Sequence, residues 1–151
     1  SNANYITVQE EINFLSEYIE LEKFRTEDSF TYRIEANQID EKIPTFIIQP
    51  FVENAIKHGL KSVSSRSELI VSFSIKAKFI EVIVTDNGIG REASNPNRRK
   101  KQSHGTRLIK ERLIIHNGER ENVLIEDLKD LDGLALGTRV KIRIKVKSKI
   151  E

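Results

Sequence analysis

Residues 68–90 read ELIVSFSIKAKFIEVIVTDNGIG, and this stretch decides the fold class of the chain. Apolar and polar side chains alternate along 68–76 and again along 79–86. Two half-buried strands are predicted, because the side-chain period of a strand is two residues. The connection Lys76-Ala77-Lys78 leaves room only for a tight turn, so the two strands are expected to pair as a hairpin.

Asp86 is the first residue of this stretch that suggests a chemical role. It has the same parity as Ile80, Val82 and Val84, so in a regular strand its carboxylate points into the apolar layer. Burial of an ionised carboxylate without partners is costly, so a hydrogen-bond donor must face it, and a ligand is one such donor. The alternative is that the strand has already turned and that Asp86 opens a plain Asp-Asn-Gly turn.

Helical and strand patterns lie on both sides of the hairpin. The expected elements are helices over 7–25, 44–58 and about 106–116, and further strands over 30–35, about 121–127 and 137–147. Most strands follow one another through short connections, which favours antiparallel pairing. The elements imply an α+β fold, a two-layer sandwich in which helices cover one face of a mixed, mainly antiparallel sheet.

The first two helices have distinct start signals. Thr7 and Glu10 form a Thr-x-x-Glu capping box, and the apolar stripe that follows is wide enough to pack on two surfaces or on a partner. In the second helix Pro44 suits the first turn, whereas Pro50 either kinks the helix or marks its true start. Gly59 is expected to end this helix.

The composition excludes several classes of protein. The 151 residues are 38% hydrophobic and 32% charged, a balance typical of one folded domain rather than of a disordered chain. Cysteine is absent, which excludes disulfides and thiolate chemistry and suits a reducing compartment. No apolar run approaches the length of a transmembrane helix, and Ser1-Asn2-Ala3 reads as a cloning remnant.

Charge is unevenly distributed, although the net charge is only 25 − 23 = +2. Residues 91–112 carry eight bases against Glu92 and Glu111, which indicates either a solvated loop or a polyanion partner. Within this stretch, 91–104 is polar and long enough to be a functional loop. Aromatic side chains do not interleave with the bases at 98–101, so a nucleic-acid partner is not expected.

The second helix carries a polar stripe opposite its apolar one. Its members recur at spacings of three and four and are Glu53, Asn54, Lys57 and His58. An amide oxygen, a carboxylate, an ammonium and an imidazole together suit a magnesium–phosphate group. The alternative is a solvated polar face.

Two glycine-containing segments are further candidates. Gly105-Thr106-Arg107 lies at the start of the third helix, where backbone amides and a cation either bind phosphate or form an ordinary cap. Gly137-Thr138 enters the last strand, as a plain turn or as part of the same site.

Taken in chain order, these segments resemble the ATP-binding domain of the gyrase, chaperone, histidine-kinase and mismatch-repair superfamily, and most of all the LytS-like sensor histidine kinases. The matching motifs are the N box at 49–59, the G1 box at 86–90, the G2 region at 105–113 and the Gly-Thr box at 137–140. The resemblance implies a Bergerat-type fold. It divides the chain into a linker helix from the dimerisation region at 4–26 and an ATP-binding catalytic domain at 27–151, with a lid at about 91–104.

The resemblance also implies a role for each motif residue. Asp86 would accept a hydrogen bond from the adenine amino group, with Thr138 supporting it directly or through water. Asn54 would bind Mg²⁺, and Glu53 would hold water or assist in catalysis. The other residues expected to bind ATP are Lys57 and His58 at the phosphates, Asn87, Gly88 and Gly90 at the adenine wall, and Gly105, Thr106 and Arg107 at the triphosphate.

The implied activity is that of the catalytic half of a protein-histidine kinase. It would position Mg-ATP for transfer of the γ-phosphoryl group to a histidine on an upstream helix, since none of His58, His104 and His116 has the expected acceptor setting. The implied parent is a membrane-anchored homodimer, with this domain in the cytoplasm and a response regulator of the LytTR type as its partner.

Two departures from the family pattern motivate alternatives. Ser103 stands in place of the first G2 glycine, and Leu108 stands where many relatives have a polar Asn. The chain could therefore be a degenerate ATP-binding or sensing module without phosphotransfer. A serine kinase or ATPase of the same superfamily is the other alternative.

Overall fold

The computed structural model describes residues 4–60, 66–90 and 104–147. The expected cloning remnant at 1–3 and residues 91–103 of the expected lid, with the basic cluster at 98–101, lie outside the described residues. The elements in chain order are β1 (Tyr5–Thr7), α1 (Val8–Arg25), β2 (Thr31–Ala36), β3 (Lys42–Pro44), α2 (Gln49–Asn54), the π-helix η1 (Ala55–Gly59), β4 (Glu68–Lys76), β5 (Phe79–Asp86), α4 (His104–Asn117), β6 (Val123–Lys129) and β7 (Ala135–Lys145).

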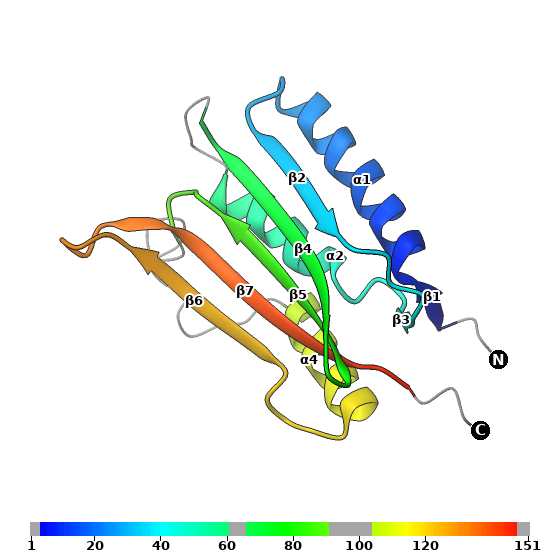
Figure 1. Cartoon of the computed structure of the whole chain (residues 1–151). Coiled ribbons are helices and arrows are strands. Elements are labelled where there is room, and N and C mark those ends of the chain that lie inside the picture. Colours follow the sequence, from blue (N-terminus) through cyan, green and yellow to red (C-terminus); the bar gives the residue numbers. More distant parts are fainter. Residues whose placement is uncertain (1–3, 61–65, 91–103, 148–151) are drawn as a thin grey trace.

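The main sheet has five strands in the order β2-β4-β5-β7-β6 (Figure 1). Strand β2 pairs with β4 in parallel, and every other neighbouring pair in this sheet is antiparallel. Strands β1 and β3 form a separate two-stranded antiparallel ribbon. The helices pack on one face of the main sheet, so the predicted α+β sandwich with a mixed, mainly antiparallel sheet is confirmed.

The hairpin at 68–86 forms with the predicted strand limits. Leu69 pairs with Asp86 at one end, and Lys76 pairs with Phe79 at the other. Ala77 has a φ of 54°, a left-handed conformation that suits a tight turn. The inward residues of both strands are buried as their apolar parity predicts, except Ile75 near the hairpin turn, which is 49% exposed.

Helix α1 belongs to the same hydrophobic core as the sheet. The predicted capping box is present: the Thr7 hydroxyl accepts from the Glu10 amide at 3.0 Å, and the Glu10 carboxylate accepts from the Thr7 amide at 3.1 Å. The buried apolar residues of α1 are Val8, Leu15 and Ile19. Its opposite side keeps Phe14, Leu21 and Phe24 exposed, so only one of the two expected packing surfaces is occupied by the described chain.

The prediction that Pro44 opens the second helix is wrong. Residues Lys42–Pro44 form strand β3, which pairs with β1 from the start of the chain. A turn follows, with Phe46 at a φ of 55°, and helix α2 begins only at Gln49 with Pro50 in its first two positions. Pro50 therefore marks the true start of the helix, one of the two readings open to the sequence.

Helix α2 continues into a π-helical turn. The amide of Leu60 donates to the carbonyl of Ala55 at 3.0 Å, a bond that spans five residues instead of four. The extra residue per turn changes the angular spacing after Ala55, so the spacing of four used to predict the polar stripe does not hold there. Lys57 is exposed and His58 is half-buried.

Helix α4 begins at His104, two residues before the predicted start, and ends at Asn117. Gly118 follows with a φ of 73°, and its amide donates to the carbonyl of Ile114 at 2.9 Å, as expected of a C-terminal glycine. The last two strands form where expected, with limits shifted by two residues. Among the described residues, no helix is long and apolar enough to cross a membrane.

Candidate functional site

Asp86 ends β5 with its side chain on the buried face. Only 4% of the residue is exposed, and Ile80, Val82 and Val84 of the same parity are buried in the core. Carboxylate Oδ1 accepts from the amide of Gly88 at 2.9 Å. Burial raises the pKa of Asp86 to about 6, although hydrogen bonds from the backbone of Gly88 and Thr138 act in the opposite direction. The structure therefore supports the inward-facing carboxylate, which remains ionisable near neutral pH.

Strand β7 brings Gly137 and Thr138 to this carboxylate. Thr138 is directly opposite Asp86 in the ladder between β5 and β7. A Cβ on Gly137 would lie 1.9 Å from the carbonyl oxygen of Asp86, so only glycine allows the two strands to approach here. From the sequence, Gly137 is part of a predicted motif, but no separate role is predicted for this residue. Its steric role depends on strand register, which no local pattern reveals.

The G1 segment 86–90 bends away from the sheet after Asp86. Gly88 and Gly90 are both buried, and Gly90 has a φ of 85°. A Cβ on Gly90 would lie 3.0 Å from the Cβ of Ala135, at the start of β7. Gly90 thus lies against the start of β7 and Gly88 against the Asp86 carboxylate, where the resemblance expects an adenine wall.

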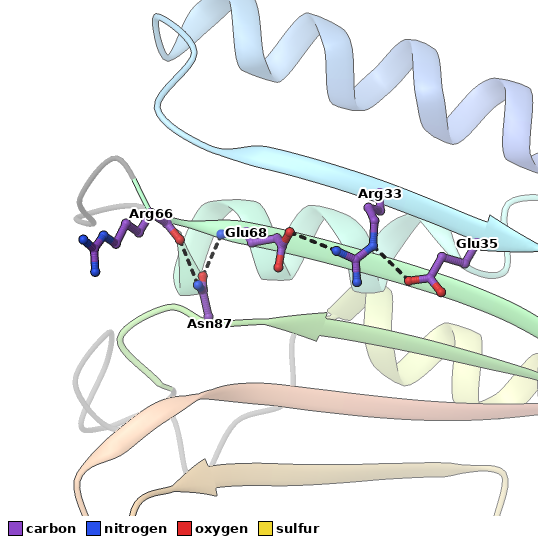
Figure 2. A network of polar contacts seen from close by, with 5 residues as sticks. All are labelled: Arg33, Glu35, Arg66, Glu68 and Asn87. Atoms are coloured by element: carbon purple, nitrogen blue, oxygen red, sulfur yellow. Dashed lines mark hydrogen bonds and ion pairs between the residues drawn. The ribbon is translucent and has the colours of Figure 1, made fainter.

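Asn87 points in a different direction. Its Oδ1 accepts from the amide of Glu68 at 2.7 Å, and its Nδ2 donates to the carbonyl of Arg66 at 2.9 Å (Figure 2). Glu68 also accepts from Arg33 at 3.3 Å on the outer face of the sheet. The Asn87 amide thus fastens the start of β4 to the G1 segment, and its contact with a nucleotide stays a prediction.

The second wall of the candidate site joins α2 to α4. Asn54 Nδ2 donates to the hydroxyl of Thr106 at 2.9 Å, and Thr106 is 6% exposed. Sequence motifs 52 residues apart are thereby brought into direct contact. Because Nδ2 is used in this bond, Oδ1 is the atom of Asn54 that could bind a cation.

Glu53, the other predicted catalytic residue, lies on the side of α2 that faces a surface hollow. Its Oε1 accepts from Gln49 Nε2 at 3.2 Å. The hollow has a volume of about 270 Å³ and is lined by these two residues with Phe46 and Pro50. Glu53 is therefore partly solvated and already oriented by its own helix.

The predicted cations are placed on accessible helix surfaces. Lys57 is exposed in η1, and Arg107 is exposed in the first turn of α4, beside the exposed Gly105. An exposed cation can reach an anionic group without losing an internal ion pair. The positions suit phosphate binding, but the described contacts do not link these side chains to Asp86.

The donor set for a metal is sparse. Among the described residues, no group of three or more His, Cys, Asp and Glu side chains could hold a metal ion. Mg²⁺ commonly uses one or two protein oxygens together with substrate phosphates and water. Oδ1 of Asn54 fits that pattern, so a metal here would need the nucleotide as a co-ligand.

No protein-family model matches the chain. It is 39% identical over 89 residues to the sensor protein LytS of Staphylococcus epidermidis, covering 58% of this chain and 15% of LytS. It is 29% identical over 96 residues to the sensor protein kinase HptS of Staphylococcus aureus, covering 62% of this chain and 18% of HptS. The chain therefore spans less than a fifth of the curated relatives that it matches.

Solved structures show the same fold. The mycobacterial sensor histidine kinase MprB superposes with a TM-score of 0.62 at 15% identity, covering 95% of this chain and 97% of the MprB chain. At such low identity the superposition supports the fold, and the sequence likeness supports the kind of domain. Over about 60% of its length the chain resembles the sensor proteins LytS and HptS, and its fold is that of the sensor histidine kinase MprB.

Proposed function

We propose that Asp86 and the Asn54–Thr106 pair mark the two ends of one Mg-ATP site. The buried carboxylate of Asp86 carries this proposal, because a 4% exposed carboxylate that accepts from two backbone amides still has acceptor capacity for a ligand. It would accept a hydrogen bond from the adenine amino group. The amides of Gly88 and Thr138 hold the carboxylate in place, so a ligand meets an oriented acceptor.

The phosphate end would lie toward α2 and α4. Asn54 presents Oδ1 for a magnesium ion, because its Nδ2 is occupied by Thr106. Lys57, His58 and Arg107 supply charge and hydrogen-bond donors, and Gly105 lets the α4 amides approach an anion closely. Mg²⁺ would neutralise phosphate charge, while these residues orient the triphosphate.

The catalytic proposal is transfer of the γ-phosphoryl group to a histidine on an upstream helix of the parent kinase. The bond from phosphorus to the ADP oxygen breaks, and a bond to an imidazole nitrogen forms. Such transfer depends mainly on positioning and charge neutralisation, which the residues above can supply. Glu53 would orient water or assist the acceptor.

The parent is proposed to be a homodimeric membrane protein with this domain in the cytoplasm, passing the phosphoryl group to a LytTR-type response regulator. The sequence likeness to LytS and HptS supports this assignment, since both are sensor proteins.

Two measurements test the proposal. Calorimetric titration with ATP and Mg²⁺ should give saturable binding that is weakened when Asp86 is replaced by Asn. Mixing the domain with the parent's upstream helices and γ-labelled ATP should give an acid-labile, base-stable phosphoprotein. A product that is acid-stable would instead indicate the serine-kinase alternative.

A sensing module without phosphotransfer is the second candidate. It is favoured by Leu108, which is 44% exposed on α4 where many relatives carry a polar Asn. The same labelling experiment distinguishes the two candidates. ATP binding with no phosphohistidine, in the presence of the upstream helices, would support the sensing module.

A further inference from the structure

Glu11 is an acidic residue that lies entirely inside the protein. It is on α1 and is 0% exposed, and it forms none of the ion pairs found between the described residues. Its Oε2 accepts from the amide of Ile48 at 3.1 Å. Its Oε1 is buried without a hydrogen-bond partner. Apolar side chains would fill this position at lower cost, so the carboxylate needs a reason other than packing.

The partner amide belongs to the turn that leads into α2. Ile48 directly precedes the helix that carries Glu53 and Asn54. Phe46 in the same turn has a φ of 55°, a strained conformation for a large side chain. A carboxylate that accepts a hydrogen bond from the Ile48 amide stabilises this turn and fixes where α2 begins.

A third element meets the same turn. Arg112 of α4 donates from Nη2 to the carbonyl of Thr45 at 2.9 Å. Its positive charge also favours the ionised form of Glu11, whereas burial raises the pKa of Glu11 overall. The turn at 45–48 is thus held from α1 by an acid and from α4 by a base.

The contact between α2 and α4 at the candidate site depends on where these helices lie. Asn54 and Thr106 meet only if α2 starts in the right place relative to α4. We propose that Glu11 is a positioning residue that sets the place of α2 through the Ile48 amide, so that displacement of α1 alters the Asn54–Thr106 pair and ATP binding. The ATP part of this inference rests on the proposed function.

Glu11→Gln tests the inference with little change in shape, and Glu11→Asp keeps the charge but shortens the reach. Ile19→Val is the matched control, because Ile19 is buried on the same helix, belongs to the core and lies eight residues beyond Glu11. Each variant is examined by hydrogen exchange, by backbone NMR and by ATP titration. Folding is checked by thermal unfolding, so that variants are compared only where each is folded.

Both Glu11 variants should speed exchange of the Ile48 amide by about tenfold or more, as expected when a charge-assisted hydrogen bond is weakened. They should also shift the Asn54 and Thr106 resonances and weaken ATP binding by about tenfold. Ile19→Val should lower stability without these effects. If Glu11→Gln does not fold, the Ile48 exchange rate and the ATP affinity of Glu11→Asp test the inference instead.

Unchanged Ile48 exchange in a folded Glu11 variant would overturn the inference. The inference would also be overturned if the Glu11 variants lost no more ATP affinity than Ile19→Val. If the unaltered chain binds no ATP, the proposed function fails, but exchange at Ile48 and the Asn54 and Thr106 resonances still decide whether Glu11 positions α2.

Discussion

Gly137 lies so close to Asp86 that a Cβ at position 137 would be 1.9 Å from the Asp86 carbonyl oxygen. Its φ of 135° is also one that residues with a side chain rarely adopt. The environment of the buried carboxylate therefore depends on a residue that contributes no side chain. The close approach also places Thr138 opposite Asp86 in the ladder.

Gly137→Ala should destabilise the fold by about 2–4 kcal/mol, because the methyl group overlaps backbone and the conformation is strained. Chemical denaturation measures the change. Gly105→Ala is the control, since a Cβ there has nothing within 4 Å, and alanine in a helix should stabilise by about 0.5–1 kcal/mol. If Gly137→Ala were as stable as Gly105→Ala, the strands β5 and β7 would be able to move apart and accommodate the added methyl group.

Asp86→Asn should reduce ATP affinity by about 1.5–3 kcal/mol, the range for a hydrogen bond to a charged group. Calorimetric titration at constant Mg²⁺ gives the affinity. The fold should survive, because the Asn oxygen can still accept from Gly88. An affinity equal to that of the unaltered chain would place the adenine elsewhere.

The contribution of Asp86 to the stability of the chain should fall as pH rises from about 4 to 7. The pKa of Asp86 is about 6 in the folded chain against 3.8 for an ordinary Asp, so protonation favours the folded state. Its contribution is complete at low pH and is lost as pH rises through 6. The loss is about 2–3 kcal/mol at 1.36 kcal/mol for each pKa unit.

The effect of Asp86 on the pH dependence of stability is obtained as the difference between the unaltered chain and Asp86→Asn. Glu11 also has a raised pKa and changes stability in the same direction, whereas the lowered pKa values of Glu10 and His116 change it in the opposite direction. Denaturant unfolding is therefore followed from pH 4 to 8 in the unaltered chain and in Asp86→Asn. The difference between the two curves should slope downward between pH 4 and 6 and be flat above about 7. A flat difference throughout would mean that Asp86 titrates normally.

Asn54→Ala should weaken ATP binding more in the presence of Mg²⁺ than in its absence, because Oδ1 is the proposed metal ligand. Titrations with and without magnesium give both affinities. Thr106→Val is the matched control: it removes the hydroxyl that holds Asn54 but leaves Oδ1 in the chain. Equal losses for Asn54→Ala under both conditions would argue against metal binding.

The sequence predicted the parts of the fold that depend on local patterns. Strict alternation set both strands of the hairpin at 68–86 and the inward direction of Asp86. The capping box at Thr7 and the glycine after Asn117 set helix ends correctly. Each of these signals acts within a few residues, where propensity and periodicity are sufficient.

The predictions from sequence were wrong or incomplete where residues far apart in the chain determine the local structure. Residues Lys42–Pro44 form a strand because Tyr5–Thr7 pairs with them, and the following turn is held by Glu11 and Arg112 from two other helices. The π-helical turn at 55–59 has no sequence signal that periodicity would detect. Nor could the sequence show that Asn54 donates to Thr106, because their distance depends on two helices packing together.

The parallel pairing of β2 with β4 has a consequence for how the molecule folds. Thr31 lies beside Glu68, and the intervening chain, which includes the helix with Glu53 and Asn54, must be accommodated before these strands can join. Parallel pairs form late because their loops are long and closing them costs entropy. Assembly of the helix that carries Glu53 and Asn54 and completion of the sheet therefore belong to a single kinetic event, so refolding followed at either place should have the same rate constant.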